Sequence, residues 1–257
     1  MIETWRWFGP KDKVTLSDIR QTGASGIVTS LYHLEPGIVW KKEEISSRLT
    51  QITGSKSQPT HLSWEVVESL PVSETIKTGS HPRDEHIKAW IESMKNLSEL
   101  GINVICYNFM PILDWTRTEL AAQMSSGATA MYFNLLDFIA FDCFILERIN
   151  AQNDYEKHLV DKAEDRFESF STEKKLLLTR NITAGLPGAG ENLTFGEVKT
   201  RLEGYSGIDA DKLRENFKYF LDAVVPTAEK LGVRLCCHPD DPPWPLLGLP
   251  RIMSTEE

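Results

Sequence analysis

The chain has 257 residues, of which 41% are hydrophobic and 25% are charged, and its formal net charge at pH 7 is −9. This length is enough for one large β/α domain, and the composition is that of an ordinary globular protein. The negative charge argues against a general nucleic-acid surface, which is usually basic, but it does not exclude an anionic small molecule, because local cations can dominate a pocket.

Short apolar runs alternate with segments of helical periodicity, which is typical of β/α units built on a parallel sheet. The expected strands are residues 5–8, 26–31, 62–68, 103–109 and 233–238. Apolar residues recur at helical spacing between residues 87 and 97 and again between 213 and 231, and Gly101 and Gly232 are placed to end these two helices.

Residues 115–183 do not fit a single crossover between two strands. Segments 133–149 and 155–170 are predicted to be helices, and Gly185-Leu-Pro-Gly-Ala-Gly190 interrupts the chain before another helix that begins near Thr194. We interpret 115–183 as a helical insertion after the fourth strand of a single domain, 1–257. A barrel of eight β/α units takes about 250 residues without large insertions. Five strands therefore predict a TIM-type (β/α) barrel that is incomplete.

The segment after the last predicted strand reads His238-Pro-Asp-Asp-Pro-Pro243. A histidine at the end of a buried strand can point its ring into the mouth of a barrel, where barrel enzymes keep metal ligands. The prolines stiffen this loop because each fixes its φ angle. From the residues alone, His238 is either a metal ligand or a hydrogen-bonded structural histidine.

This region also resembles a known family. His238-Pro-Asp-Asp-Pro-Pro243 and Gly248-Leu-Pro-Arg-Ile252 are similar to segments of mannonate dehydratase, the hydro-lyase of hexuronate breakdown. Six earlier segments resemble the same family in the same order: Trp5-Arg-Trp-Phe-Gly9, Gly26-Ile-Val-Thr29, Glu68-Ser-Leu-Pro-Val72, Cys106-Tyr-Asn-Phe-Met-Pro111, Asp114-Trp-Thr-Arg-Thr118 and Ala184-Gly-Leu-Pro-Gly188. Eight co-linear segments are far more specific than one short pattern. The resemblance implies a xylose-isomerase-like barrel and dehydration of D-mannonate to 2-dehydro-3-deoxy-D-gluconate in glucuronate catabolism.

The resemblance further implies a divalent cation, Mn²⁺ or Fe²⁺, that would stabilise the enediolate formed when the C2 proton leaves. It implies His238 as one metal ligand, while a cysteine, a second histidine and an aspartate come from later strands that this sequence lacks. Cys236 and Cys237 are expected to pack in the core instead. Asp240 and Asp241 are expected either to orient His238 or to cap the next helix.

Five residues after or within predicted strands are candidate contacts for the sugar acid: Arg6, His33, Glu68, Asn108 and Arg117. Arg6 or Arg117 could bind the substrate carboxylate through two parallel hydrogen bonds, and His33 is also a candidate for moving a proton. The alternatives are a surface-loop histidine at His33, a buried structural pair at Glu68, and an Asp114–Arg117 pair within one turn. The general base and general acid are not identified by the sequence.

Two other functions stay open at this point: a truncated, catalytically inactive homologue, and a related metal-dependent β/α-barrel sugar isomerase or epimerase. The first residues lack the basic and apolar regions of a signal peptide, and the apolar stretch 133–146 is broken by two aspartates. Four cysteines without a regular framework fit reduced thiols. We therefore expect a cytoplasmic enzyme that acts on a small-molecule sugar acid and has neither nucleic acid nor membrane as a partner. A homo-oligomer is compatible with this expectation.

Overall fold

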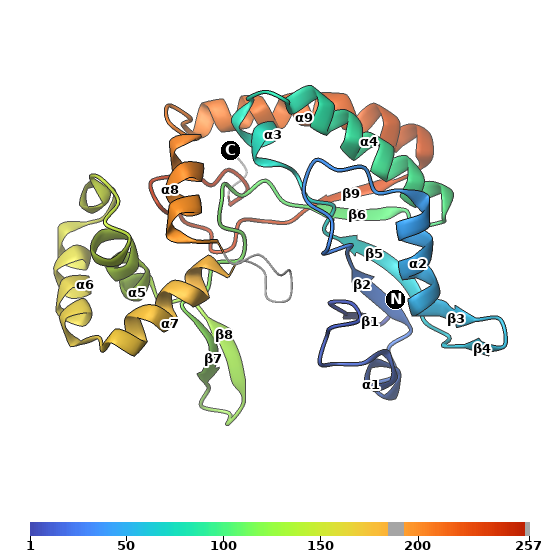
Figure 1. Ribbon diagram of the computed structural model, residues 1–257, viewed down its shortest axis with the longest axis horizontal. Helices are drawn as coiled ribbons and strands as arrows, with labels where there is room; N and C mark the ends of the chain where they lie inside the picture. Colours follow the sequence, from blue (N-terminus) through green and yellow to red (C-terminus); the bar gives the residue numbers. More distant parts are fainter. Residues whose placement is uncertain (185–192, 255–257) are drawn as a thin grey trace. The chain divides into compact units, whose positions relative to one another are not determined.

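The structure, a computed structural model, describes residues 1–184 and 193–254 (Figure 1). Clustering of contacts divides the chain into two compact units. The first comprises Met1–Phe109 and Asp211–Pro239, and the second comprises Met110–Ala210 and Asp240–Glu257. The predicted organisation as one domain stays a prediction, and each unit is described by itself.

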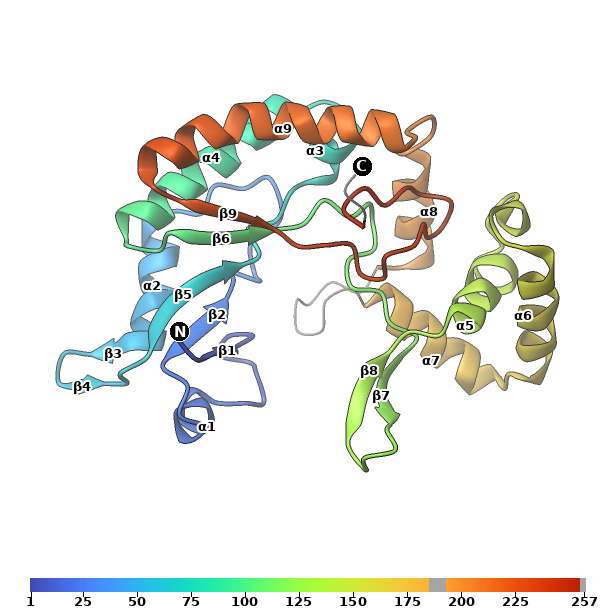
Figure 2. The same cartoon turned by 180° about the vertical axis from the view of Figure 1, so that it is seen from behind.

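The first unit is built on a sheet of five parallel strands in the order β1-β2-β5-β6-β9 (Figure 2). The strands are β1 (Thr4–Arg6), β2 (Gly26–Thr29), β5 (Ser63–Glu68), β6 (Val104–Tyr107) and β9 (Arg234–Cys237). All five predicted strands are confirmed, and so is the parallel α/β class. The sheet of the described residues is open, with β1 and β9 at its edges, so the predicted barrel is not closed here.

Two long helices, α4 (Arg83–Glu99) and α9 (Ala210–Leu231), lie side by side along β6 and β9 (Figures 1 and 2). Both were predicted, and the glycines expected to end them have positive φ angles, 82° at Gly101 and 67° at Gly232. Their inner faces meet through aromatic rings, because Trp90 packs edge-on against Phe220 at 5.2 Å between ring centroids. Tyr107 on β6 completes this cluster, which forms the core on that side of the sheet.

Shorter elements complete the first unit: helices α1 (Leu16–Gln21), α2 (Lys42–Thr53) and α3 (Glu74–Thr78), and the small hairpin of β3 (Gly54–Ser55) and β4 (Gln58–Pro59). Helix α1 begins with a capping box between Thr15 and Asp18, which satisfies backbone N–H groups of its first turn. None of the described helices of either unit is long and apolar enough to cross a membrane.

The second unit begins with an antiparallel hairpin, β7 (Glu119–Gln123) and β8 (Thr129–Tyr132), and continues with helices. These are α5 (Leu135–Ala140), the π-helical turn η1 (Phe141–Ile145), the 3₁₀ turn η2 (Ala151–Asp154), α6 (Lys157–Ser169), α7 (Thr172–Thr183) and α8 (Phe195–Glu203). The segment interpreted as a helical insertion, 115–183, thus starts with a hairpin that the sequence analysis did not predict. The hairpin segment is rich in alanine, which favours helix by intrinsic propensity, and its turn contains Gly127 at φ 85°.

The predicted helices of this unit are otherwise confirmed. Asn134 accepts N–H groups of Leu136 and Asp137, so the helix expected from residue 133 begins at Leu135. The helix expected near Thr194 is α8, and Thr194 forms a capping box with Glu197. The predicted glycine-rich break at 185–190 lies outside the described residues, and α7 was not predicted.

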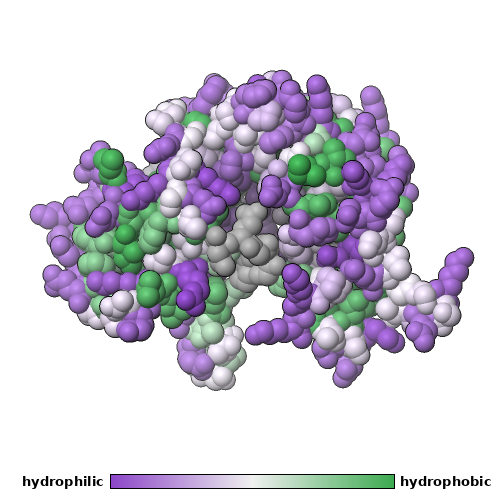
Figure 3. All heavy atoms as spheres, viewed as in Figure 1, coloured by the Kyte–Doolittle hydropathy of each residue, from purple (hydrophilic) through white to green (hydrophobic). Residues whose placement is uncertain are grey.

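Helices α5 and α6 pack through a small apolar core around Ile139 and Ala163, both fully buried. Phe144 and Phe167 stack at its margin with ring centroids 5.4 Å apart. Figure 3 shows hydrophobic side chains between these helices and hydrophilic ones along the outer edge of α6 (Figure 3). Most charged residues of segment 155–170 thus lie on the exposed face of α6.

A buried ion cluster ties Asp142 in η1 to Arg148 and to η2. Asp142 is fully buried and accepts hydrogen bonds from Arg148 at 2.9 and 2.7 Å and from the Tyr155 hydroxyl at 2.7 Å. Arg148 also donates to Asp154 at 2.6 Å. Burial alone would lower the pKa of Arg148, but the two carboxylates outweigh it and raise that pKa. The cluster compensates a carboxylate that has no access to water.

We expect Arg148→Ala to lower the free energy of unfolding by about 3–5 kcal/mol, because it would leave Asp142 buried without its cation. Chemical denaturation followed by circular dichroism measures this change. Lys218→Ala is the matched control, since Lys218 and Asp222 form an exposed pair on α9 that contributes little. Equal destabilisation by the two substitutions would contradict the role of the cluster.

Candidate functional site

Three ionisable residues share one rung of the parallel sheet, near the carboxyl ends of its strands. Glu68 on β5 is the register partner of Cys106 on β6, and Cys106 is the partner of Cys236 on β9. Side chains at matched positions of parallel strands point to the same face. His238 lies two residues after Cys236, and its N–H donates to the Tyr107 carbonyl at 2.7 Å, so the ladder continues to His238. This edge of the first unit is the candidate site.

Arg6 on β1 and Glu68 form an ion pair at this edge, and both side chains are about four-fifths buried. The Arg6 guanidinium also lies over the ring of Phe8, 5.7 Å from its centroid. The Tyr32 hydroxyl donates to the Glu68 carbonyl at 3.4 Å, and burial raises the pKa of Tyr32 to about 12. Arg6 and Glu68 therefore form the buried structural pair that was the alternative for Glu68. Contact of Arg6, Glu68 and Asn108 with a sugar acid stays a prediction.

His33 is half exposed, and its Nε2 atom lies 3.0 Å from a carboxylate oxygen of Glu44 on α2. This exposed position agrees with the alternative in which His33 is a histidine of a surface loop. A role of His33 in substrate contact or proton transfer stays a prediction.

His238 has its ring oriented by the next residue, since Nδ1 lies 2.6 Å from the Pro239 carbonyl oxygen. A carbonyl can only accept, so Nδ1 carries the proton and the lone pair of the neutral ring is on Nε2. Hydrogen bonds of this kind set the tautomer of metal-binding histidines. The geometry is therefore compatible with His238 as a metal ligand through Nε2.

The cysteines divide between the two faces of the sheet. Cys237 pairs in register with Tyr107 and hydrogen-bonds its hydroxyl on the helix-covered face, which agrees with the expected packing role. Cys236 is exposed, so the expected core packing does not hold for it in the described structure. Burial, with Glu68 nearby, raises the pKa of the Cys106 thiol to about 12. Cys106 is therefore unsuited to act as a nucleophile near neutral pH.

The two aspartates that follow His238 are anchored within the second unit. Asp241 receives two parallel hydrogen bonds from Arg117, at 2.9 and 2.8 Å. Asp240 accepts the Met253 N–H at 2.7 Å and the Ser254 hydroxyl at 3.0 Å, and its other oxygen lies 3.9 Å from Arg251. No helix follows Asp240 and Asp241 in the described part of the chain, so orienting His238 and capping the next helix both stay predictions for them.

These contacts change the interpretation of Arg117. Its guanidinium binds a carboxylate of its own chain, and binding a substrate carboxylate would require that ion pair to open. The sequence did not predict Asp241 as its partner. It also did not single out Arg251, which lies in the segment Gly248-Leu-Pro-Arg-Ile252 and donates to the Leu113 carbonyl at 2.8 Å. Burial lowers the pKa of Arg251, although three carboxylates nearby oppose this effect.

Arg48 on α2 is a second residue that the sequence analysis missed. It is 7% exposed, donates to the Ser30 carbonyl at 3.0 Å just after β2, and lies over the ring of Trp7 at 5.3 Å. Burial lowers its pKa, and no acidic side chain pairs with it among residues 1–184 and 193–254. The sequence could have indicated a buried role for Arg48, because Arg48 lies between Ile45 and Ile52 on the apolar face of the helix.

The predicted metal was tested against the side chains present. Within the described ranges, no group of three or more His, Cys, Asp or Glu side chains is arranged to hold a metal ion. His238 has the tautomer of a ligand, but the described residues supply no complete ligand set.

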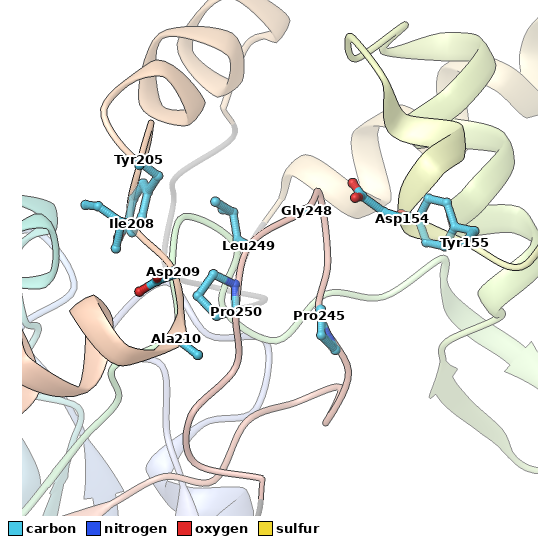
Figure 4. A pocket seen from close by; sticks show the side chains of 11 residues that line it. Asp154, Tyr155, Tyr205, Ile208, Asp209, Ala210, Pro245, Gly248, Leu249 and Pro250 are labelled. Carbon is cyan, nitrogen blue, oxygen red and sulfur yellow. The ribbon is translucent and has the colours of Figure 1, made fainter.

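A separate cavity of about 620 Å³ lies in the second unit (Figure 4). Its lining comes from three segments of the chain: Asp154 and Tyr155; Tyr205, Gly207, Ile208, Asp209 and Ala210; and Pro245, Gly248, Leu249 and Pro250. Figure 4 shows the carboxylates of Asp154 and Asp209 on opposite sides of the loop that carries Leu249 and Pro250. None of the predicted site residues lines it.

The first unit is a parallel α/β fold in which Glu68, Cys106, Cys236 and His238 gather at the carboxyl ends of the strands. Active sites of parallel α/β folds lie at that edge. Residues 1–257 match the family described as D-mannonate dehydratase (UxuA). The chain therefore belongs to the D-mannonate dehydratase family, which confirms the resemblance found in eight segments.

Individual relatives agree with the family assignment. The chain is 47% identical over 257 residues to mannonate dehydratase of Rhizobium meliloti (strain 1021) and 49% identical over 256 residues to mannonate dehydratase 1 of Agrobacterium fabrum (strain C58 / ATCC 33970). Each alignment covers 100% of this chain, but 63% and 62% of the relatives. The crystal structure of mannonate dehydratase from Streptococcus suis serotype 2 is similar with a TM-score of 0.69 and 30% identity, over 99% of this chain and 58% of that one. The chain thus spans less than two thirds of these proteins.

We expect iodoacetamide at pH 8 to modify Cys236 much faster than Cys106 or Cys143. Cys236 is exposed, whereas burial raises the pKa of Cys106 to about 12 and that of Cys143 to about 11. A thiol with a pKa of 12 is ionised to about one part in ten thousand at pH 8, and the thiolate is the reacting form. Mass spectrometry of tryptic peptides gives the three rates. The pKa assignments are wrong if Cys106 reacts first.

Proposed function

We propose that this chain is part of a mannonate dehydratase, which removes water from D-mannonate to give 2-dehydro-3-deoxy-D-gluconate. The observation that carries the proposal is the family match over residues 1–257, supported by relatives at 47% and 49% identity. The chain spans less than two thirds of those relatives. The proposed activity is therefore that of a whole protein that contains this chain.

In this proposal, the carboxyl edge of the five-stranded sheet faces the sugar acid. Arg6 and Glu68 are held together there and could contact hydroxyl groups as a fixed pair, together with Asn108. The parallel sheet with helices α4 and α9 along it supports a TIM-type, xylose-isomerase-like barrel as the complete architecture. A cytoplasmic location and a role in glucuronate catabolism belong to the same proposal.

We further propose Mn²⁺ or Fe²⁺ as the cofactor, with Nε2 of His238 as one ligand. When bound, such a cation would stabilise negative charge on the oxygens of the substrate as the C2 proton leaves. The orientation of the His238 ring by the Pro239 carbonyl supports this assignment. The remaining ligands, the general base and the general acid are not assigned.

The substrate can be tested directly. A protein containing this chain, incubated with D-mannonate and Mn²⁺ or Fe²⁺, should form a 2-keto acid that is measured with semicarbazide. Neutral aldoses and ketoses are the controls, because turnover of these sugars would indicate an isomerase. Activity on a neutral sugar without activity on D-mannonate would refute the proposal, and inactivity on every substrate would favour the catalytically inactive homologue.

The metal ligand has its own test. In the metal-binding protein, we expect His238→Ala to weaken Mn²⁺ binding by more than about 10–100-fold, because losing even an indirect partner of a metal site typically costs that much. Isothermal titration with Mn²⁺ measures the affinity without turnover. Cys237→Ala is the matched control, since the adjacent side chain lies on the opposite face beside Tyr107. Loss of Mn²⁺ binding in Cys237→Ala alone would reverse the assignment.

A further inference from the structure

Arg48 on α2 is a buried cation whose hydrogen-bond partners are uncharged in the part of the chain that the structure describes. Its Nη1 atom donates to the Ser30 carbonyl at 3.0 Å and to the Thr29 hydroxyl at 3.4 Å. Its guanidinium also lies over the ring of Trp7. Because an arginine stays protonated at any ordinary pH, the first unit holds a full positive charge in its interior.

These contacts place the charge at the carboxyl ends of β1 and β2. Trp7 directly follows β1, and Ser30 directly follows β2. The Thr29 hydroxyl donates to the Trp7 carbonyl at 2.5 Å, which joins the two strand ends beside the guanidinium. Gly9 lies against the same group, because a Cβ atom at this position would be 2.8 Å from Nη1 of Arg48. The described residues thus enclose the cation almost completely.

Burial of this charge costs free energy. It lowers the pKa of Arg48, and among the described residues only the Tyr32 hydroxyl opposes this effect, so no carboxylate stabilises the cation. Packing does not require the charge, because Arg48 shares the apolar face of α2 with Ile45 and Ile52, where an uncharged side chain would fit. Proteins retain such locally unfavourable groups mainly at functional sites. The charge therefore indicates a role in binding.

The other ionised groups that act at this place cancel each other. Arg6 and Glu68 form an ion pair, so together they add no net charge. Burial raises the pKa of the Tyr32 hydroxyl to about 12. Arg6 and Arg48 lower that pKa and Glu68 raises it, so all three charges are felt at one point of the edge. The surplus positive charge there is that of Arg48.

We propose that Arg48 is a specificity-determining residue, which makes this edge select an anionic sugar acid over a neutral sugar with the same hydroxyl groups. It acts through its charge and not through contact, since only 7% of the residue is exposed. The surrounding protein has a low dielectric constant, which extends the attraction over several ångströms. This role rests on the proposed function, because a sugar acid is the substrate class that the charge distinguishes.

D-Mannonate and D-mannitol are matched probes, because they share the groups from C2 to C6 and only mannonate carries a carboxylate at C1. Isothermal titration of a protein that contains this chain, at low ionic strength and without added metal, gives their dissociation constants. We expect Arg48→Gln to weaken D-mannonate binding by about five- to ten-fold, because it removes a charge that acts within about 10 Å. Binding of D-mannitol should change by less than about two-fold.

Arg20→Gln is the matched control, since it removes the same charge from an exposed position at the end of α1, before the amino end of β2. Arg48→Lys retains the charge, and we expect its affinity for D-mannonate to stay within about three-fold of the wild type. This variant decides the question where circular dichroism shows that Arg48→Gln does not fold.

Four results would overturn the proposal: a wild-type protein that binds D-mannonate no more tightly than D-mannitol, a folded Arg48→Gln protein that keeps its affinity for D-mannonate, an equal loss in Arg20→Gln, or a ten-fold loss in folded Arg48→Lys. Selective binding of D-mannonate without formation of a 2-keto acid is a different outcome. It would refute the proposed dehydratase activity and support the role of Arg48.

Discussion

The parallel register of β5, β6 and β9 is the constraint on which the candidate site depends. It places Glu68, Cys106 and Cys236 on one rung, and the continuation of the ladder to His238 keeps that histidine at the same edge. A shift of one residue in any strand would send its side chain to the helix-covered face. The aromatic cluster of Trp90, Tyr107 and Phe220 opposes such a shift, because it fills that face with large buried rings.

Local patterns were sufficient to predict the sheet and the two long helices of the first unit, but not its shorter elements. The five strands were identified from short apolar runs and the helices α4 and α9 from apolar periodicity and terminal glycines, because each of these two helices buries one continuous face. The hairpin of β7 and β8 was missed for the opposite reason. It buries almost nothing, so its sequence carries no alternation, and Leu120, Ala121 and Ala122 favour a helix by intrinsic propensity.

The candidate site was predictable in part. The position of His238 follows from the strand that ends before it, and that strand is visible in the sequence. The ion pairs are different, because Arg117 and Asp241 lie 124 positions apart and nothing local distinguishes this pairing from the Asp114–Arg117 alternative. Arg48 could have been found from its place on the apolar face of α2, since a charged residue there requires buried partners.

The ion pairs of Arg6 and Arg117 limit how these arginines could bind the carboxylate of the proposed sugar-acid substrate. Arg6 pairs with Glu68, and Arg117 pairs with Asp241, so the two arginines predicted to grip a carboxylate already bind one. Releasing either arginine would leave a carboxylate that is at least about two-thirds buried without its cation, which opposes substrate binding. Arg48 is different, because carbonyl and hydroxyl groups and an aromatic ring surround it at the end of β2. It raises the positive potential at that edge without an ion pair to break, but its burial limits direct contact. In a chain of net charge −9, Arg48 is thus a cation of the first unit whose charge no carboxylate offsets by direct pairing among the described residues.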